Sequence, residues 1–178
     1  MSVRRLPRLM SFAALVLAFG GQAAAATAAD YSLAAGSVRF SAPTGWPRIM
    51  EKDDGDPQFI AFQVPDPSPT GHEVLARVTV TVHTVSDAQA FKTWVDAGLA
   101  KARGLPQYQS GARGTGSSRF TYTAMENKQR LDYRESYYFK GNQGVQLRCV
   151  RPLVSLAGPA WTAAFDRGCD AVARSLGG

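Results

Sequence analysis

Acid–base or nucleophilic chemistry would depend on very few side chains in this sequence, which has two histidines, His72 and His83. A nucleophile usually needs a base beside it, but His72 lies in a proline-rich stretch and His83 ends the polar face of a predicted strand. The sequence also lacks a Gly-x-Ser-x-Gly motif, the signature of one large class of hydrolases. We therefore predict two exposed histidines and no catalytic residue. A hydrolase that uses His72 or His83 is the less favoured alternative.

Two short segments resemble ion-binding motifs without completing them. Asp53, Asp54 and Asp56 match part of a calcium-binding loop, but the full spacing and the closing glutamate are missing. Residues 53–57 are better explained as a hairpin turn, because they combine three acids with a glycine and a proline. Residues 111–116 contain Gly-x-x-Gly-x-Gly, but no predicted strand precedes them and no helix follows, as a phosphate site would require. We expect no metal ion and no cofactor.

A concentration of tyrosine and arginine in residues 119–151 is the strongest candidate for a binding surface. These two residue types often anchor protein interfaces. Alternation along the strand predicted at residues 130–139 places Arg134 and Tyr138 opposite its apolar face. Replacing both with alanine should then remove binding without lowering the melting temperature. An ordinary solvated sheet face is the alternative interpretation. The candidate partner-binding residues are Arg134, Tyr138, Arg119, Tyr122 and Arg148.

The elements that would position these residues form a predicted antiparallel sheet. Between residues 75 and 85 valines alternate with polar residues, which is typical of a strand whose two faces differ. Short turns join the last three strands, so these should form an antiparallel meander. The predicted strands are residues 37–41, 48–52, 58–64, 75–85, 119–125, 130–139 and 145–151. The face of the 130–139 strand that is expected to lie under helices carries Leu131, Tyr133, Tyr137 and Phe139.

The first amphipathic helix is predicted between Ser86 and Gly104. Ser86 and Gln89 together match a capping box, and an apolar stripe at spacings of three and four residues follows. Residues 65–71 before it carry three prolines and are predicted to be an exposed loop. Residues 107–118 after it are rich in glycine, serine and glutamine, and they are predicted to form a mobile loop.

Cys149 and Cys169 are predicted to form a disulfide bond. Cys149 lies on the apolar face of the last strand, and Cys169 lies on the apolar stripe of a final helix that starts near Gly158. The two patterns bring the sulfur atoms together, and closing a loop of about 20 residues contributes about 3 kcal/mol in the chain-entropy model. A redox or nucleophilic thiol is the alternative, but the spacing is not that of a Cys-x-x-Cys motif.

The first 29 residues have the three-part organisation of a secretory signal peptide. Arg4, Arg5 and Arg8 form a positive start, residues 9–20 are a short apolar run, and residues 23–29 are rich in alanine. The apolar run is shorter than the roughly 20 residues that span a membrane, so a membrane anchor is the less favoured alternative. The leader does not end in a cysteine that could carry a lipid. We predict a periplasmic or secreted chain.

Removal of this leader lowers the net positive charge of the chain. Residues 1–29 hold three of the 20 Lys and Arg residues and none of the 14 Asp and Glu residues, so the net charge falls from +6 to +3. The remaining charges are scattered, which argues against a nucleic-acid partner. Cleavage is expected after Ala26, Ala28 or Ala29. Residues 30–178 should then form a single domain, because about 150 residues is a usual size for one hydrophobic core.

Residues 38–46, which read Val-Arg-Phe-Ser-Ala-Pro-Thr-Gly-Trp, resemble the opening strand and turn of the PsbP-like family. That family shares its fold with the Ran-binding protein Mog. Residues 76–82, the helix after Ser86 and residues 165–176 fit the family more loosely. The resemblance implies an α+β fold in which helices sandwich an antiparallel β-sheet (α/β/α). It also implies binding in place of catalysis, since members act as adaptors, chaperones, assembly factors or inhibitors. No ligand residue carries over, because the family shares no active site.

These features lead to one main expectation about function. We expect an exported, non-enzymatic domain that binds a protein of the envelope or one delivered by a neighbouring cell, as an adaptor, assembly factor or toxin-immunity protein. The alternative is a small-ligand or envelope-glycan binder that uses the tyrosine and arginine face. Neither nucleic acid nor a membrane segment of the processed chain is expected.

Overall fold

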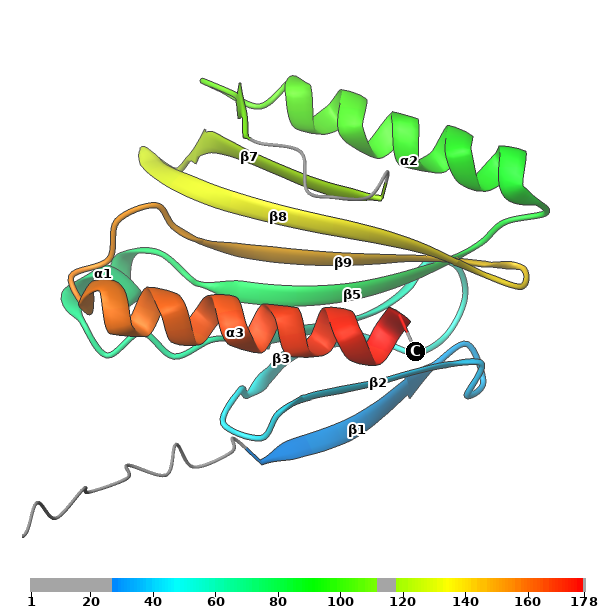
Figure 1. Cartoon of the computed structure of the whole chain (residues 1–178), viewed down its shortest axis with the longest axis horizontal. Helices are drawn as coiled ribbons and strands as arrows, with labels where there is room; N and C mark the ends of the chain where they lie inside the picture. Colours follow the sequence, from blue (N-terminus) through cyan, green and yellow to red (C-terminus); the bar gives the residue numbers. More distant parts are fainter. Residues whose placement is uncertain (1–26, 112–117, 178) are drawn as a thin grey trace, which may run out of the picture.

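A computed structural model of the chain describes residues 27–111 and 118–177 (Figure 1). Residues 1–26 of the predicted leader (residues 1–29) and residues 112–117, half of the predicted mobile loop, lie outside the described residues. In chain order the elements are β1 (Ala28–Leu33), β2 (Val38–Pro43), β3 (Arg48–Lys52), β4 (Gln58–Gln63), α1 (Pro69–Glu73), β5 (Arg77–Thr84), α2 (Ala88–Arg103), β6 (Gln109–Ser110), β7 (Arg119–Glu126), β8 (Gln129–Lys140), β9 (Gln143–Pro152) and α3 (Gly158–Gly177).

Seven strands form one antiparallel sheet in the order β3-β4-β5-β9-β8-β7-β6, and β1 pairs with β2 in a separate hairpin. The meander predicted for the last three strands is confirmed, because β8 pairs with β7 on one side and with β9 on the other. β5 lies next to β9 and pairs with it from Arg77 to Thr84. The β3–β4 hairpin extends the sheet beyond β5.

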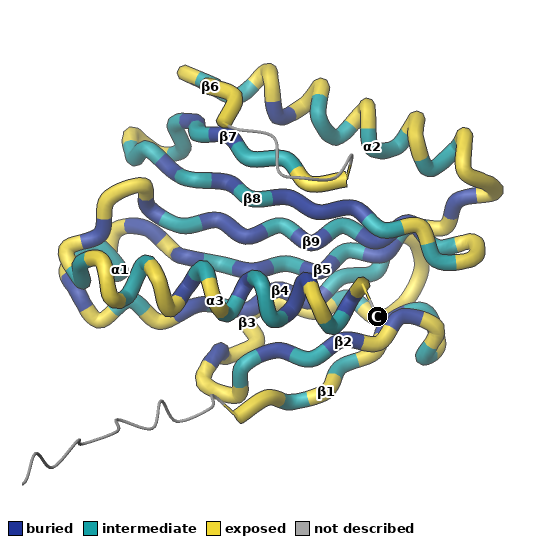
Figure 2. Tube along the Cα trace, in the orientation of Figure 1, coloured by how far each residue is buried: buried dark blue, intermediate teal, exposed yellow. Residues whose placement is uncertain are grey.

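α3 and the β1–β2 hairpin cover one face of this sheet, the face that α3 crosses in Figure 1. The valines of β5 alternate as predicted, and Val78, Val80 and Val82 are buried in the core on this side. Phe165 and Leu176 on the apolar stripe of α3 are buried against them. Figure 2 shows the resulting alternation of buried and half-buried residues along β5 and β9.

Two close contacts hold α3, one to the sheet and one to the turn after β2. A disulfide bond joins Cys149 of β9 to Cys169 of α3, so the predicted pairing is confirmed. The ring of Trp46, from the Pro-Thr-Gly-Trp turn after β2, lies against Gly168, where an added Cβ would be 2.7 Å from Cη2 of Trp46. A glycine at residue 168 therefore lets the turn approach the helix backbone.

α2 packs on the opposite face, over the half of the sheet formed by β7, β8 and β9. Ala102 of α2 is buried with Leu131 and Tyr133 of β8 in a second core. The predicted apolar face of β8 is thus confirmed for Leu131, Tyr133 and Tyr137, which are buried, whereas Phe139 remains 41% exposed. The prediction that helices sandwich an antiparallel sheet is confirmed.

The N-terminal strand β1 was not among the predicted strands. β1 begins at Ala28 and pairs with β2 from Ala28 opposite Pro43 to Leu33 opposite Val38. The sequence Ala-Ala-Asp-Tyr-Ser-Leu starts with small residues that resemble a cleavage region, and only Tyr31 and Leu33 alternate as in a strand. Of the three expected cleavage positions, the one after Ala26 leaves this strand whole.

The start of α2 differs from the prediction by one residue. Asp87, and not Ser86, is the N-cap, and its carboxylate accepts a 2.8 Å hydrogen bond from the amide of Ala90. This bond lowers the pKa of Asp87. Ser86 instead donates its hydroxyl to Asp87. The two adjacent residues are both good caps, and the aspartate takes the position because its side chain reaches the third amide of the helix.

The two predicted loops also contain short elements. α1 occupies part of the segment predicted as an exposed loop, beginning with Pro69 in its first turn. β6 pairs Gln109 and Ser110 with β7 inside the segment predicted as a mobile loop, of which residues 112–117 lie outside the described residues. Within the described ranges, no helix has the length and apolar character needed to cross a membrane.

Candidate functional site

The five candidate partner-binding residues do not lie on one surface. Arg119, Arg134 and Tyr138 lie on the α3 side of the sheet, whereas Tyr122 and Arg148 lie on the α2 side. The pairing register explains the division, because Arg148 lies directly opposite Glu135, the neighbour of Arg134 along β8, and successive side chains of a strand point to opposite faces.

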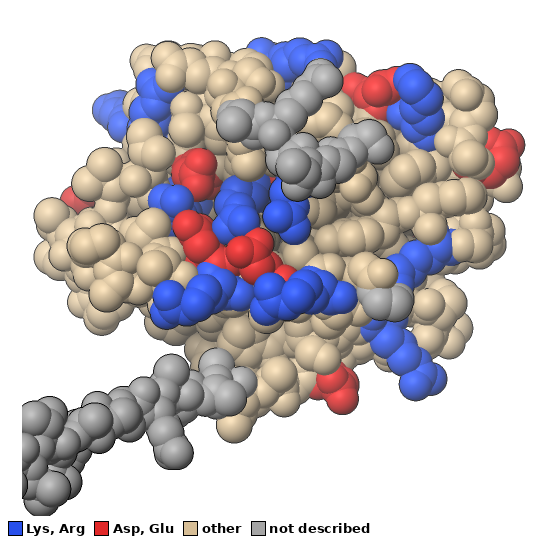
Figure 3. Space-filling model, viewed as in Figure 1, with Lys and Arg blue, Asp and Glu red and all other residues tan. Residues whose placement is uncertain are grey.

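The α3 side holds an ion-pair cluster that links β8 and β9 to α3 (Figure 3). Arg134 reaches two carboxylates of α3, with Nη2 2.7 Å from Oδ1 of Asp170 and Nη1 3.3 Å from Oδ1 of Asp166. Arg151 binds Asp166 through Nε at 3.2 Å and Asp132 through Nη2 at 2.9 Å. Side chains of Arg134 and Arg151 are only 20% and 11% exposed. This α3 cluster consists of Arg119, Asp132, Arg134, Arg151, Asp166 and Asp170.

The charged side chains of the α3 cluster pair with one another within the protein. Burial raises the pKa of Asp132, although the charge of Arg151 opposes this effect. Tyr138 belongs to the same surface and donates its hydroxyl to the carbonyl of Ala173 in α3 at 3.1 Å. Arg134 and Tyr138 thus help to hold α3 in place. The structure does not support the expectation that replacing them would leave stability unchanged.

The α2 side holds a second cluster, built around the fully buried carboxylate of Glu135. Oε1 of Glu135 accepts hydrogen bonds from the hydroxyl of Tyr122 at 2.7 Å and from Nε of Arg148 at 2.7 Å. Oε2 accepts from the hydroxyl of Tyr137 at 2.6 Å and from Nε2 of Gln146 at 3.2 Å. We call these five residues the Glu135 network. A buried carboxylate is tolerated when it is paired and hydrogen-bonded in this way.

Electrostatics keep the donors of the Glu135 network in their protonated forms. Burial and the nearby charge of Glu135 raise the pKa of Tyr122 and of Tyr137 far above the usual range of a phenol. Burial alone would lower the pKa of Arg148, but the charge of Glu135 outweighs it and raises that pKa. Arg148 therefore stays a cation, and its side chain is 40% exposed although its partner Glu135 is not exposed at all.

A smaller ion pair lies beside this network on the same face. Nη2 of Arg77 lies 3.0 and 2.9 Å from the two carboxylate oxygens of Glu126, and the hydroxyl of Tyr133 donates to Glu126 at 2.9 Å. Burial and this hydrogen bond raise the pKa of Tyr133 to about 12. The rings of Tyr133 and Tyr122 stack with centroids 4.6 Å apart. The stacked rings therefore place the Arg77–Glu126 pair next to the Glu135 network.

The histidines are placed differently from each other. His72 is exposed in α1, as predicted. His83 is half-buried, stacks on Trp94 and has Nδ1 2.9 Å from Oδ1 of Asp56. Sequence reasoning missed this pair because Asp56 comes from the β3–β4 turn, 27 residues away. Among the described residues, no hydroxyl or thiol is hydrogen-bonded to the other nitrogen of His83, and no group of three potential metal ligands occurs.

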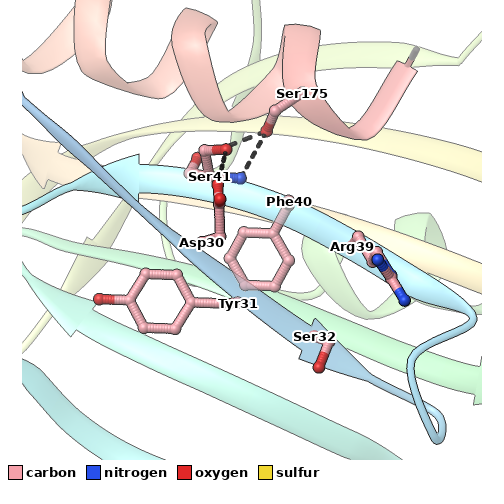
Figure 4. A pocket seen from close by; sticks show the side chains of 7 residues that line it. All are labelled: Asp30, Tyr31, Ser32, Arg39, Phe40, Ser41 and Ser175. Atoms are coloured by element: carbon pink, nitrogen blue, oxygen red, sulfur yellow. Dashed lines mark hydrogen bonds between the residues drawn. The ribbon is translucent and has the colours of Figure 1, made fainter.

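An open pocket of about 450 Å³ lies along the β1–β2 hairpin at the end of α3 (Figure 4). In its lining, Asp30 accepts a hydrogen bond from the hydroxyl of Ser41 at 2.6 Å. The hydroxyl of Ser175 in α3 accepts a 3.0 Å hydrogen bond from the amide of Ser41. Ser32 and Arg39 complete the polar part of the lining. Sequence analysis did not identify this pocket because β1 was not predicted.

Comparison with solved structures identifies the architecture. The fold is that of Mog1p. The structure of this Ran-binding protein from Saccharomyces cerevisiae aligns with a TM-score of 0.50 and 14% sequence identity, over 85% of this chain and 95% of Mog1p. This likeness establishes the fold alone, and it confirms the fold implied by the PsbP-like resemblance.

Two further structures align at lower TM-scores. LpqN, involved in cell envelope biogenesis of Mycobacterium tuberculosis, aligns at 0.45 with 11% identity over 86% of this chain and 83% of LpqN. PsbP of the cyanobacterium Synechocystis, CyanoP, aligns at 0.46 with 11% identity over 87% of this chain and 94% of CyanoP. By sequence, neither a protein-family model nor a curated protein matches this chain.

Proposed function

We propose that this chain is an exported, periplasmic domain that binds another protein and catalyses no reaction of its own. Its partner is a protein of the envelope or one delivered by a neighbouring cell, and a toxin-immunity or inhibitor role is one concrete form of this activity. Export is supported by the predicted leader and by the Cys149–Cys169 bond, since disulfides persist mainly outside the cytoplasm.

The loop between β9 and α3 is the observation that carries the proposal. Val154 and Leu156 are 79% and 74% exposed, and Leu153 is 40% exposed. Figure 2 shows this loop at the end of the molecule near α1. Contiguous exposed apolar side chains of this kind often mark interaction surfaces.

This apolar loop is held in place and is not a frayed segment. Ser155, between the exposed Val154 and Leu156, is buried and donates its hydroxyl to Asp66 at 2.6 Å. The amide of Leu156 donates to the hydroxyl of Thr70 at 3.1 Å. Burial would raise the pKa of Asp66, but hydrogen bonds from Ser155 and Ser68 outweigh it and lower that pKa, which keeps the anchor charged. The polar residue is thus turned inward while the apolar residues face water, as expected for a surface that a partner covers.

The fold is compatible with this function. Mog1p is described as a Ran-binding protein, so the same architecture can serve protein recognition. The candidate residues Arg134, Tyr138, Arg119 and Arg148 remain proposed contacts. Tyr122 is only 2% exposed and donates its hydroxyl to Glu135, so we propose that it supports Arg148 without touching a partner. The two faces on which the proposed contacts lie are separate, so a single flat interface would not contact all of them.

A small polar ligand or an envelope glycan is a second candidate, favoured by the pocket of the β1–β2 hairpin. Its hydroxyl and charged groups, from residues such as Asp30, Ser32 and Arg39, suit sugar hydroxyls. A ligand of this pocket would raise the melting temperature, since a ligand at 100 times its Kd adds about 2.7 kcal/mol. Replacing Ser32 with tryptophan should abolish that shift.

Affinity capture tests the primary proposal. The tagged, processed chain is incubated with an envelope extract, and a second chain carrying Val154→Ser and Leu156→Ser serves as the comparison. We expect one stoichiometric protein with the unaltered chain and at least about tenfold less with the variant. Equal capture by both chains would remove the apolar loop from the proposal, and no capture by a folded chain would contradict the proposal itself.

A further inference from the structure

We infer that Arg148 is a preorganised receptor for a carboxylate side chain in an acidic segment of the protein partner. The inference rests on the proposed protein-binding function and adds the chemistry of the partner to it. It concerns the exposed edge of Arg148 in β9, on the α2 side of the sheet, which is a different surface from the apolar loop.

The inner edge of the Arg148 guanidinium is fixed by the Glu135 network. Nε of Arg148 donates to Oε1 of Glu135 at 2.7 Å. Glu135 has no exposed surface and is itself held by the hydroxyls of Tyr122 and Tyr137. Because these groups are buried, they restrain the arginine in one orientation before any partner arrives.

The outer edge of the same guanidinium remains available. The side chain of Arg148 is 40% exposed, and within residues 27–111 and 118–177 its Nη1 and Nη2 have no hydrogen-bond partner. These two nitrogens form a planar fork that suits a carboxylate in a bidentate arrangement. An arginine that is already ordered loses little side-chain entropy on binding, so this geometry favours affinity.

Arg134 and Arg151, the two less exposed arginines of the α3 cluster, differ in this respect. Both terminal nitrogens of Arg134 are paired with carboxylates of α3, those of Asp166 and Asp170. Arg151 uses Nε and Nη2 for carboxylates, and its Nη1 donates to the carbonyl of Pro152. The structure therefore places Arg148 above Arg134 as a contact for an anionic group.

The neighbours of Arg148 indicate what surrounds that carboxylate. The pairing register aligns Met50, Ala61, Thr79, Arg148 and Glu135 in one row across β3, β4, β5, β9 and β8, on one face of the sheet. Thr79 lies directly opposite Arg148, and Met50 at the far end of the row is 58% exposed. An acidic side chain followed by an apolar one would match this row, with the acid over Arg148 and the apolar side chain toward Met50.

The charges of this face favour an acidic segment over a basic one. The carboxylate of Glu135 is buried beneath the surface, and that of Glu126 is bound by Arg77 and Tyr133. Arg148 is thus the charged group of the row that faces outward with an unused hydrogen-bonding edge.

A titration with a defined acidic peptide tests the inference. The full processed chain is labelled with ¹⁵N, and the Nε–Hε signal of Arg148 is followed as capped hexaglutamate is added at low salt, with capped hexaglutamine as the control peptide. We expect a saturable shift with hexaglutamate alone. Arg148→Lys keeps the charge but loses the fork, and it should weaken hexaglutamate binding at least about tenfold. Binding by this variant that equals binding by the unaltered chain would overturn the inference.

Two further variants separate a local effect from unfolding and from general charge. The double variant Glu135→Gln and Arg148→Gln keeps hydrogen-bonding side chains at both positions, and it should remain folded and lose hexaglutamate binding. Arg48→Gln removes an arginine of β3 that is 50% exposed and paired with Glu51, and it should bind as the unaltered chain does. If Arg48→Gln weakens binding as much as Arg148→Lys, the attraction is non-specific and the inference fails. The peptide experiment tests whether Arg148 binds a carboxylate, whereas affinity capture tests the protein-binding function. Either proposal can therefore be contradicted while the other stands.

Discussion

Glu135 and Arg148 face each other directly across β8 and β9, with one carboxylate oxygen 2.7 Å from Nε of the arginine. One partner is fully buried and the other is 40% exposed, so the pair joins the core under α2 to the surface of the sheet. Removing one member of a buried pair is strongly destabilising because an uncompensated charge stays behind. The pair is therefore both a structural element and the base of the proposed receptor.

The first prediction concerns the coupling of this pair. Arg148→Ala should lower the free energy of unfolding by about 3 kcal/mol, because it leaves Glu135 buried and unpaired. The double variant Glu135→Gln and Arg148→Gln should lower the free energy of unfolding by clearly less, since no buried charge remains. Urea denaturation measures both values. A double variant that is less stable than Arg148→Ala would contradict this account of the pair.

The second prediction concerns acid stability. Burial would raise the pKa of Glu126, but the hydrogen bond and charge of Arg77 outweigh it and lower that pKa below its ordinary value of 4.5. A carboxylate with a lowered pKa in the folded state stabilises the fold above its unfolded pKa, and this contribution is lost as the pH falls through the folded pKa. Compared with Glu126→Gln, the unaltered chain should be more stable at pH 6 by roughly 0.5 kcal/mol or less, a small value because Glu126 is 39% exposed.

The measurement for Glu126 is the urea midpoint of both chains from pH 7 down to pH 2.5. The two midpoints should converge below pH 4.5. A difference that stays constant over this range would show that Glu126 does not act through its charge.

The third prediction corrects the expectation for Arg134 and Tyr138. Because these residues bind Asp166, Asp170 and the carbonyl of Ala173, replacing both with alanine should loosen α3 and lower stability by about 2 kcal/mol. A matched control is Arg48→Ala, which breaks an exposed pair and should change stability by less than about 1 kcal/mol. Thermal unfolding distinguishes the two. An unchanged melting temperature for the Arg134 and Tyr138 double variant would restore the original expectation.

The fourth prediction uses the close approach of Trp46 to α3. Glycine to alanine inside a helix normally stabilises by about 0.5–1 kcal/mol. Gly168→Ala should instead destabilise by about 2 kcal/mol, because the new Cβ would overlap the Trp46 ring. In a Trp46→Phe background the smaller ring leaves room, so Gly168→Ala should no longer destabilise. A double-mutant cycle by urea denaturation tests this, and additive effects would argue against the contact.

Much of the fold could be predicted because local patterns and tertiary structure agree. The valines of β5 alternate, the turns between β7, β8 and β9 are short, and the stripe of α3 is regular, so strands, meander and last helix followed from the sequence. The same two periodicities correctly placed Cys149 beside Cys169. β1 was missed because two alanines, an aspartate and a serine give no strand signal by themselves. Its pairing with β2 supplies what the local sequence lacks.

The candidate site could be predicted only in part. Strand alternation located Arg134 and Tyr138 on one face, but it could not show that aspartates of α3, about 30 residues later, would bind Arg134. The sequence did indicate that Glu135 would be buried, because it alternates with Tyr133 and Tyr137 on the apolar face of β8. A charged residue at such a position must find buried partners, and Arg148 and Tyr122 could be identified only once the strands were paired.

The most direct test of the protein-binding claim is sedimentation velocity on purified components. The processed chain is mixed with the purified protein that affinity capture identifies, over a range of concentrations and at two salt concentrations. We predict a saturable complex of fixed stoichiometry with a Kd below about 1 μM, and a weaker complex at high salt. If the two proteins sediment independently at tens of micromolar while a glycan raises the melting temperature of the chain, the protein-binding function is wrong and the pocket of the β1–β2 hairpin becomes the functional site.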